Sequence, residues 1–340
     1  MPNQAQNGYA FEYAIIESIP IMIEDWITRN NKGSCNFELI TDEAFRNIQE
    51  KFSATSAELK AKMRLAAKAG LKKILDMEPR MVFAPKNDPL IISSNPASNG
   101  IEGDVRDIVM IRQLSQSRRR GHQVDINQHH PWEIGISAKW NNDVIKNPRL
   151  AEHLDFCQSW FGFPCSGEYW QDITQPMNYV RAHLGRNWSE LLRKRELVYL
   201  PMTNAFINEV SRQSQAHSNL PELLVNYLIG KFDFYKMIAK RDQQITNVQV
   251  FNLRGNLNQV DDRNLPMIHI NSQSNQRPTR IVSIGHYRER DSWVEIILDN
   301  GWQFTLRLHN AETKIVPSLK FDIRFSGSPV NTWSESWQTT

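Results

Sequence analysis

Two short segments in the middle of the chain constrain its fold more than any other feature. Residues 108–111 form an apolar run directly after Asp107, and residues 132–139 place apolar side chains at every second position up to Lys139. Segments of this length, bounded by polar residues, are typical of β-strands. A basic and polar stretch, residues 115–130, separates them. The two segments therefore predict neighbouring strands of one sheet, joined by a long connection.

The N-terminal third favours helices. Apolar residues recur at helical spacing over residues 11–19, and Pro20 is expected to end that helix. Thr55 and Glu58 form a capping box ahead of a second apolar stripe, because a hydroxyl and a carboxylate at this spacing satisfy the first backbone N–H groups. We therefore expect two helices before the first strand.

The second half alternates between helical and strand patterns. Pro148 is expected to open a helix over residues 148–161, since proline favours early helical positions. Residues 205–240 continue the helical pattern. Asn300-Gly301 is a strong hairpin signal, because both residues accept positive φ. Strands are expected on both sides of it, over residues 281–287, 293–298, 302–308 and 319–325.

These elements predict an α/β (α+β) fold with a mixed sheet core flanked by helices and a β-rich C-terminal region. The length of 340 residues exceeds the usual size of a single domain. We expect residues 1–270 to form the core, with a helical N-terminal part, and residues 271–340 to form a β-meander packed on it.

Composition narrows the functional class only slightly. The chain has 40 Lys and Arg residues against 37 Asp and Glu, and a net charge of +3 permits a nucleic-acid partner without requiring one. No apolar run approaches the roughly 18 residues of a membrane span, and the N-terminus lacks a secretion signal. The three cysteines form no CxxC pair, which argues against a disulfide framework or a structural zinc site. We expect a cytoplasmic protein without membrane association.

The most informative chemistry lies at the ends of the two central strands. Because side chains alternate along a strand, Ser137 and Lys139 share one face, about 7 Å apart. Asp107 lies at the mouth of the other strand. A carboxylate beside a lysine can hold a divalent metal ion and a water molecule together. The lysine can position the nucleophile as an ammonium group or deprotonate it as a neutral amine. This arrangement favours phosphodiester hydrolysis.

A second carboxylate is needed, because Ser137 carries no negative charge. Glu133 precedes Lys139 by six residues, roughly 20 Å along an extended strand, and is discounted. Glu152 follows Lys139 by thirteen residues, on the helix expected there, and is preferred. Asp104 is an alternative to Asp107, but residues three apart face opposite sides of a strand. Asp107 is favoured because it directly precedes the apolar run.

The set Asp107, Ser137-Ala138-Lys139 and Glu152 resembles the motif of the PD-(D/E)xK nucleases, with serine in place of the usual second acid. The sequence segments AFEYA, GDVRDIVMIR, WEIGISAKWNNDVIKNPRL and FTLRLHNAETKIVPSLKFDI resemble the type II restriction endonucleases of the HaeIII family. The resemblance covers residues from about 8 to 325. It implies Mg²⁺-dependent cleavage of double-stranded DNA within GGCC, in a restriction-modification system whose DNA methyltransferase acts on the same site without needing to bind this protein. It also implies a further metal ligand on an early helix, for which Glu12 is the candidate.

Candidate DNA contacts follow from this resemblance. Arg118, Arg119 and Arg120 form a compact basic run, which is either a solvated loop or, in a nuclease, a phosphate contact. Amide and basic side chains that follow Lys139 could reach phosphates or base edges: Asn141, Asn142, Lys146 and Arg149. A palindromic site matches two-fold protein symmetry, so a homodimer on DNA is expected; a monomer that cuts the two strands in succession is the alternative.

Three alternatives are open to test. Cys165, in the sequence Gly-Phe-Pro-Cys, resembles the nucleophile segment of cytosine-C5 DNA methyltransferases, but Ser166 follows where those enzymes have glutamine. His129 and His130 suggest an HNH nuclease, but the strand that follows leaves no room for its helix ligands. The third is a catalytically inactive or non-specific DNA-binding protein of the same fold. Digestion of DNA with Mg²⁺ separates the third from a site-specific nuclease.

Overall fold

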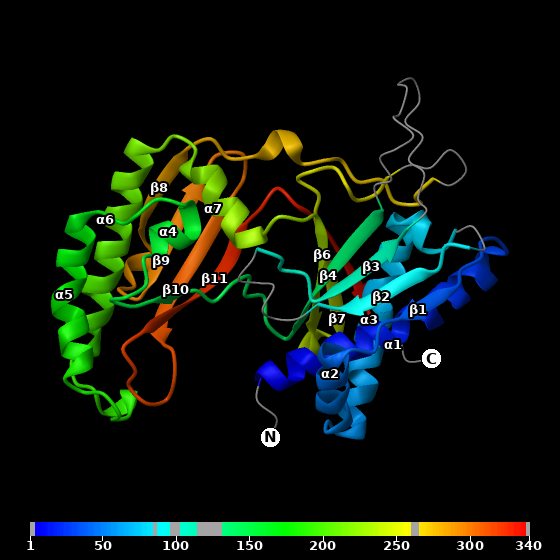
Figure 1. Cartoon of the computed structure of the whole chain (residues 1–340), viewed down its shortest axis with the longest axis horizontal. Coiled ribbons are helices and arrows are strands. Elements are labelled where there is room, and N and C mark those ends of the chain that lie inside the picture. Colours follow the sequence, from blue (N-terminus) through cyan, green and yellow to red (C-terminus); the bar gives the residue numbers. More distant parts are fainter. Residues whose placement is uncertain (1–3, 84–86, 96–102, 114–130, 260–264, 338–340) are drawn as a thin grey trace. The chain divides into compact units, whose positions relative to one another are not determined.

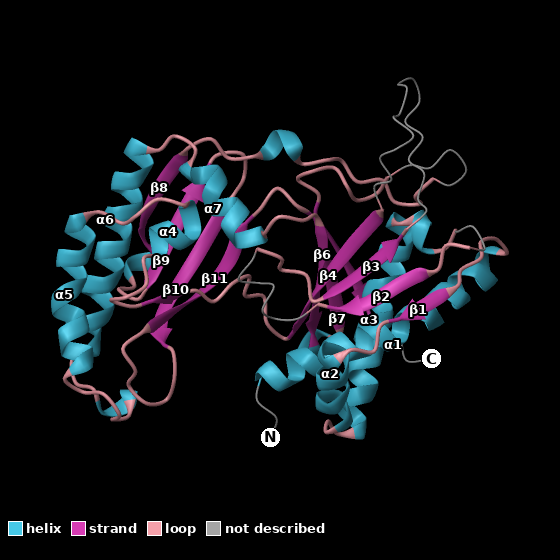
Figure 2. Ribbon diagram, in the orientation of Figure 1, coloured by secondary structure: helices cyan, strands magenta, loops and turns pink. Residues whose placement is uncertain are grey.

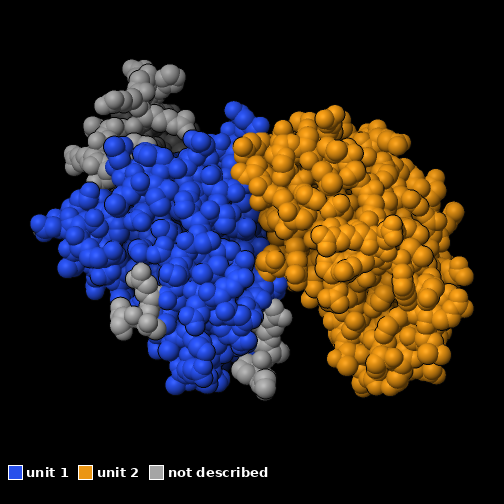
Figure 3. Space-filling model, turned by 180° about the vertical axis from the view of Figure 1, so that it is seen from behind, with its two compact units in different colours: residues 1–142, 231–275, 330–340 blue, residues 143–230, 276–329 orange. Residues whose placement is uncertain are grey.

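The computed structural model describes residues 4–83, 87–95, 103–113, 131–259 and 265–337. The chain forms two compact units (Figure 3). Unit 1 contains residues 1–142, 231–275 and 330–340, and unit 2 contains residues 143–230 and 276–329. Both units are assembled from separate stretches of chain, so they do not follow the boundary at residue 270 expected from the sequence. The reason is that strands from the middle and the end of the chain pair with one another.

Unit 1 is built on a seven-stranded mixed sheet (Figure 1). The two central strands predicted from the sequence are confirmed as β3 (Ile108–Arg112) and β4 (Trp132–Trp140), which pair antiparallel. β4 also pairs parallel with β6 (Phe234–Lys240). The sheet order is β1-β2-β3-β4-β6-β7-β12, in which the remaining strands are β1 (Phe37–Leu39), β2 (Leu90–Ser94), β7 (Ile245–Phe251) and β12 (Asn331–Ser336).

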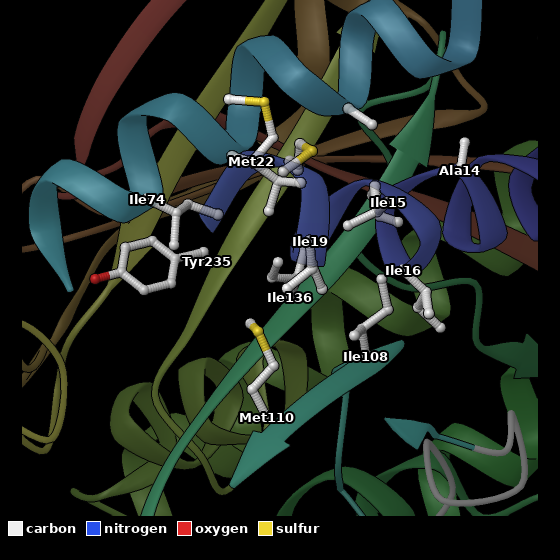
Figure 4. Packing of buried hydrophobic residues seen from close by; sticks show 14 of the residues in the cluster. Ala14, Ile15, Ile16, Ile19, Met22, Ile74, Ile108, Met110, Ile136 and Tyr235 are labelled. Atoms are coloured by element: carbon white, nitrogen blue, oxygen red, sulfur yellow. The ribbon is translucent and has the colours of Figure 1, made fainter. Parts of the chain in front are cut away.

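Three helices belong to unit 1: α1 (Gln4–Asn30), α2 (Glu43–Ser53) and α3 (Ala57–Met77). One hydrophobic cluster joins α1 and α3 to one face of the sheet; Ile15 and Ile19 of α1 lie near Ile136 of β4 (Figure 4). Burying this apolar stripe is what holds the two helices on the sheet.

Two details of these helices differ from the predictions. Pro20 lies inside α1 and does not end it, because the apolar stripe continues through Ile23 and Trp26, both buried in the core. The N-cap of α3 is Ser56, whose hydroxyl accepts a hydrogen bond from the backbone of Leu59 at 3.3 Å. Packing of the whole stripe outweighs the local stop signal in α1.

Unit 2 contains a five-stranded antiparallel sheet and four helices (Figure 2). The sheet order is β5-β11-β10-β9-β8, with bounds β5 (Arg149–Leu150), β8 (Ile281–His286), β9 (Trp293–Leu298), β10 (Gln303–Asn310) and β11 (Leu319–Gly327). The four predicted C-terminal strands are therefore confirmed. Asn300 and Gly301 turn between β9 and β10 with φ of 56° and 87°, as the hairpin signal predicts.

The helices of unit 2 are α4 (Phe156–Phe161), α5 (Gly167–Arg181), α6 (Leu200–Ala216) and α7 (Leu220–Ile229). The helix expected over residues 148–161 is wrong in its first half, because Leu150 joins the sheet as part of β5 and Asp155 caps α4. The helical pattern over residues 205–240 ends with α7, and its last part is strand β6. Short helical turns connect these elements at Pro79–Met81, Trp188–Glu190, Arg195–Tyr199, Arg241–Gln243, Ser274–Gln276 and Tyr287–Glu289.

The architecture confirms the mixed α/β class predicted from the sequence. Within the described residues, no helix combines the length and the apolar character needed to cross a lipid bilayer.

Candidate active site

Asp107 lies where β3 begins, and the backbone holds it from two sides. Its N–H donates to the carbonyl oxygen of Ile136 at 2.9 Å, and its own carbonyl oxygen accepts from the N–H of Asn95 at 2.9 Å. The side chain turns back onto β4, where Oδ2 accepts a hydrogen bond from the N–H of Ala138 at 2.6 Å. The carboxylate is therefore fixed against the end of the neighbouring strand.

The structure brings Ser137 and Lys139 to the same carboxylate oxygen. Asp107 Oδ2 lies 3.2 Å from Ser137 Oγ and 3.3 Å from Lys139 Nζ. Ile136 and Ala138, which alternate with them, belong to the hydrophobic core on the opposite face of β4. The alternation of a strand therefore delivers the hydroxyl and the ammonium group to one side, as the spacing predicts.

Glu12 of α1 is the second carboxylate at this place. Glu12 is only 8% exposed. Burial raises the pKa of Glu12 well above its usual value, the negative charge of Asp107 raises it further, and Lys139 acts in the opposite direction. Two buried carboxylates that repel each other electrostatically form a favourable binding site for a cation. The oxygen donors of Glu12 and Asp107 fit a hard divalent ion.

Arg106 joins three parts of this site. Its Nε and Nη2 each lie 2.8 Å from an oxygen of Asp104, and its Nη1 pairs with Glu133 of β4. The guanidinium carbon lies 3.8 Å from the centre of the Phe232 ring. Since Arg106 precedes Asp107 directly, these contacts fix the backbone that presents Asp107. Asp104 and Glu133 are thus held by an arginine.

Gly135 makes room for this arrangement. A Cβ atom at Gly135 would lie 2.1 Å from Cδ of Arg106, so the arginine side chain crosses β4 only because that residue is glycine. Sequence reasoning missed both roles. Alternation along β4 places residue 135 on the face of Ser137 and Lys139, but nothing in the sequence indicates an arginine lying over that position.

Lys236 was also missed. It is 2% exposed and pairs in register with Ser137 across the parallel β4–β6 ladder. Residues paired in this way point to the same face of a sheet. A buried lysine therefore lies beside Ser137. It was missed because residues 205–240 were expected to be helical, and strand β6 was not recognised there.

Comparison with known proteins identifies the group to which this chain belongs. Residues 8–329 match the family model described as HaeIII restriction endonuclease. The chain belongs to that family. It is also 33% identical over 326 residues to the type II restriction enzyme HaeIII of Haemophilus aegyptius, a match that covers 95% of this chain and 94% of that enzyme. No solved structure matches the chain.

Family membership makes the chain a type II site-specific deoxyribonuclease, the class predicted from the sequence. Such enzymes act on double-stranded DNA and, as a class, use a divalent metal ion. Asp107 and Lys139 are in contact in the structure, and both act electrostatically on Glu12.

Glu152, the other predicted acid of the family site, lies in unit 2. It follows β5 in a turn and is not on a helix. Its carboxylate pairs with Arg181 of α5 and lies 3.0 Å from Nε2 of His153. Both partners belong to unit 2, so within that unit the charge of Glu152 is already met by cationic or potentially cationic neighbours.

The predicted DNA contacts fall into three groups. Arg118, Arg119 and Arg120 lie outside the described residues, as do His129 and His130. Asn141 turns the chain after β4 with φ of 53°, and its Oδ1 accepts from the N–H of Arg241 at 3.3 Å; Asn142 follows it as the last residue of this stretch of unit 1.

Lys146 and Arg149 have different surroundings within unit 2. Lys146 Nζ donates to the carbonyl oxygen of Tyr227 at 2.9 Å and lies over that ring, and burial lowers its pKa to about 8. Arg149 is exposed and donates to Ser318 Oγ at 3.2 Å. Arg149 is therefore the more accessible of the two.

The methyltransferase alternative receives no support from the surroundings of Cys165. The thiol of Cys165 is buried beside the thiol of Cys157 and the carboxylate of Glu209. The hydrogen bond with Cys165, followed by burial, raises the pKa of Cys157 far above its usual value. Glu209 in turn accepts hydrogen bonds from Ser166 and Gln213. This cluster ties α5 to α6, and the raised pKa of Cys157 disfavours its thiolate.

Proposed function

We propose that this protein hydrolyses phosphodiester bonds of duplex DNA at a short palindrome, with Mg²⁺, at the site formed by Asp107, Glu12 and Lys139. The observation that carries the proposal is the pair of hydrogen bonds at Asp107 Oδ2. This oxygen accepts one from the backbone N–H of Ala138 and one from Nζ of Lys139. Glu12 interacts electrostatically with both Asp107 and Lys139.

The donor set fits a magnesium ion. Asp107 and Glu12 supply carboxylate oxygens, which Mg²⁺ prefers, and it commonly completes its shell with water and substrate oxygens. Once bound, the ion supplies charge neutralisation of the phosphate and acidification of a water molecule. Asp104 is a weaker candidate, since Arg106 occupies both of its oxygens. Glu152 is the ligand that spacing along the chain favours, and Glu12 is the one that local geometry supports.

The residues of β4 have separate roles in this proposal. The ammonium group of Lys139 holds the attacking water in place and meets negative charge that develops on the phosphate. Ser137 donates its hydroxyl hydrogen to Asp107, which orients that carboxylate. The backbone N–H of Ala138 does the same from the plane of the sheet.

GGCC is the expected recognition sequence, because the sequence segments around Glu12, Asp107 and Lys139 resemble those of the HaeIII family. Arg118, Arg119 and Arg120, with Asn141, Asn142, Lys146 and Arg149, are the proposed DNA contacts. A two-fold homodimer is proposed on the palindrome, since each chain carries one metal site. The enzyme would act in the cytoplasm as part of a restriction-modification system, with a methyltransferase protecting the same site.

The test is digestion of DNA of known sequence with Mg²⁺, followed by sequencing of the fragment ends. Every end should fall within GGCC, because each wrong base pair costs about 1–3 kcal/mol in recognition. The variants Asp107→Asn and Lys139→Met should still bind DNA but not cut it. Ends at another palindrome would overturn the recognition sequence alone. Unchanged cutting by both variants would overturn the site.

A further inference from the structure

One face of the unit 2 sheet is not covered by the helices of that unit. Val294, Leu306 and Phe321 alternate along β9, β10 and β11 and are buried. Phe321 packs its ring against those of Phe206 in α6 and Trp160 in α4, at 5.0 and 6.5 Å between centroids. The helices therefore cover the face that carries these residues, and the intervening residues point to the opposite side.

We call that opposite side the open face, and its charged members are Arg149, Glu295, Arg307, His309, Lys320, Asp322 and Arg324. Their positions follow from strand register. Lys320 pairs with Arg149 on β5 and with His309 on β10, while Asp322 pairs with Arg307. Paired residues lie about 5 Å apart and successive residues of one face about 7 Å apart. The open face thus carries an ordered array of mainly basic groups.

The acidic members of this set are already engaged. Glu295 Oε1 accepts a hydrogen bond from Gln303 Nε2 at 2.7 Å. Asp322 has two partners. Its Oδ1 accepts from Asn147 Nδ2 at 2.7 Å and lies 3.1 Å from His309 Nε2. Arg324 in turn lies 3.3 Å from Asp143.

The remaining cations make no close ion pair; the charge of Lys320 helps to lower the pKa of Asp322 without a direct contact. Across the described part of the chain, no carboxylate oxygen comes within 4.0 Å of the cationic groups of Arg149, Arg307 or Lys320. Arg149 and Arg307 are exposed and Lys320 is half-buried. Three cations held on one rigid surface without an ion-pair partner produce a positive field that favours an anionic partner.

We propose that the open face binds the phosphate backbone of duplex DNA through Arg149, Arg307 and Lys320. The inference rests on the proposed function, which supplies the polyanion. Phosphates recur at regular intervals along each DNA strand, and a rigid sheet presents cations at regular intervals without further ordering of the chain. Such contacts position the protein and do not read sequence.

The experiment compares two triple variants that lose the same charge. Arg149→Ala, Arg307→Ala and Lys320→Ala are combined in one protein. The control combines Arg186→Ala, Arg280→Ala and Lys314→Ala, three exposed residues of unit 2 that lie outside its strands. Binding to GGCC-containing and unrelated duplexes is measured in EDTA over a series of salt concentrations, so that no cleavage interferes. Thermal melting of both variants checks that they are folded.

The open-face variant should lose affinity equally for both duplexes. The slope of log K against log salt should fall by about 1 for each phosphate contact removed, hence by about 3. The control should keep the slope of the unmodified protein. Unchanged binding by the open-face variant, an equal loss in the control, or a loss confined to the GGCC duplex would each overturn the proposal.

These outcomes are independent of those for the cleavage site. If the open-face variant loses binding while Asp107→Asn still cuts, the proposed cleavage site fails and the open face stands. If Asp107→Asn abolishes cutting while the open-face variant binds normally, the open face fails and the proposed function stands.

Discussion

Glu12 and Glu152 are both predicted to hold a metal ion, and their surroundings differ. Glu12 is buried in unit 1, where the nearest charges that affect it are those of Asp107 and Lys139. Glu152 is paired with Arg181 in unit 2. The charge of Asp107 acts on Glu12, so a bound cation would stabilise the two carboxylates together. Glu152 already has a cationic partner, Arg181. From these surroundings we predict that distance along the chain from Lys139 is a poor guide to which acid serves the site.

The largest expected effect distinguishes the two glutamates directly. Glu12→Gln keeps the shape of the side chain and removes its charge, so cleavage should fall by at least about 10²–10³-fold, as is usual when one electrostatic contributor to a transition state is removed. Stability in EDTA should not fall, because the substitution removes a buried charge beside Asp107. Cleavage rates at saturating Mg²⁺ and a melting curve in EDTA provide the two measurements.

The matched control is Glu17→Gln on the same helix. Glu17 pairs with Arg64 at 2.5 Å and takes no part in the site. It should cut at the rate of the unmodified protein. Normal cutting by Glu12→Gln would show that Glu12 is not a ligand.

A third buried carboxylate sharpens the comparison, because Glu78 shares the burial of Glu12 but not its charged neighbours. Glu78 Oε1 accepts from Tyr235 Oη at 2.6 Å and from the N–H of Asn258 at 2.7 Å, and its Oε2 has no hydrogen-bond partner in the described part of the chain. Burial raises the pKa of Glu78 from 4.5 to about 7. Glu78 is therefore protonated in the folded protein under mildly acidic conditions.

The consequence is a stability that falls as pH rises. Between pH 4.5 and about 7 the folded protein keeps the Glu78 proton that the unfolded chain releases. The contribution is fully present below pH 4.5 and is lost by about pH 7, a change of about 3 kcal/mol in the free energy of unfolding. Urea unfolding at a series of pH values should show this slope, and Glu78→Gln should remove it. A slope that is the same in both proteins would contradict the assignment.

Part of this fold could be predicted from the sequence, for identifiable reasons. β3, β4 and the C-terminal strands have patterns of period two or short apolar runs, so their positions were predicted. β6 was mistaken for helix because six of its seven residues are buried, which leaves no alternation to detect. Pro148 suggested a helix, but Leu150 gains more by joining the sheet of unit 2.

The site divides in the same way. Asp107, Ser137 and Lys139 could be predicted to converge because strand periodicity fixes their faces. Arg106 could not, because its role depends on three contacts from different elements and on the space above Gly135. Sequence spacing reports on regular elements and says little about irregular loops such as the one that ends at Asp107.

A smaller effect is expected where the site is held in place. Arg106→Met should raise the Mg²⁺ concentration needed for half-maximal cleavage about 10–100-fold, the usual cost of losing a group that orients a metal ligand. Gly135→Ala should do the same, since its Cβ would displace Arg106. DNA affinity in EDTA should not change in either variant, and Arg106→Lys should recover part of the loss.

The control for this pair is Gly285→Ala in β8, where an added Cβ meets nothing within 4 Å. Its metal requirement should equal that of the unmodified protein. If Arg106→Met weakened DNA binding and left the Mg²⁺ requirement unchanged, Arg106 would act on DNA and not on Asp107.

The smallest effect is expected at Glu152. Its pair with Arg181 is half exposed on the arginine side, and pairs of this kind contribute at most about 1 kcal/mol to stability. Glu152→Gln should therefore lower the free energy of unfolding by less than about 1 kcal/mol, and Arg181→Ala should have no additional effect in the double variant. Cleavage should change by less than about twofold, because Arg181 and His153 both contact the Glu152 carboxylate and would have to be displaced before it could bind a metal ion. If Glu152→Gln instead abolished cleavage while DNA binding persisted, the order of the two glutamates would be reversed. The arginine would then be a partner that the metal ion replaces, and spacing along the chain would have been the better guide.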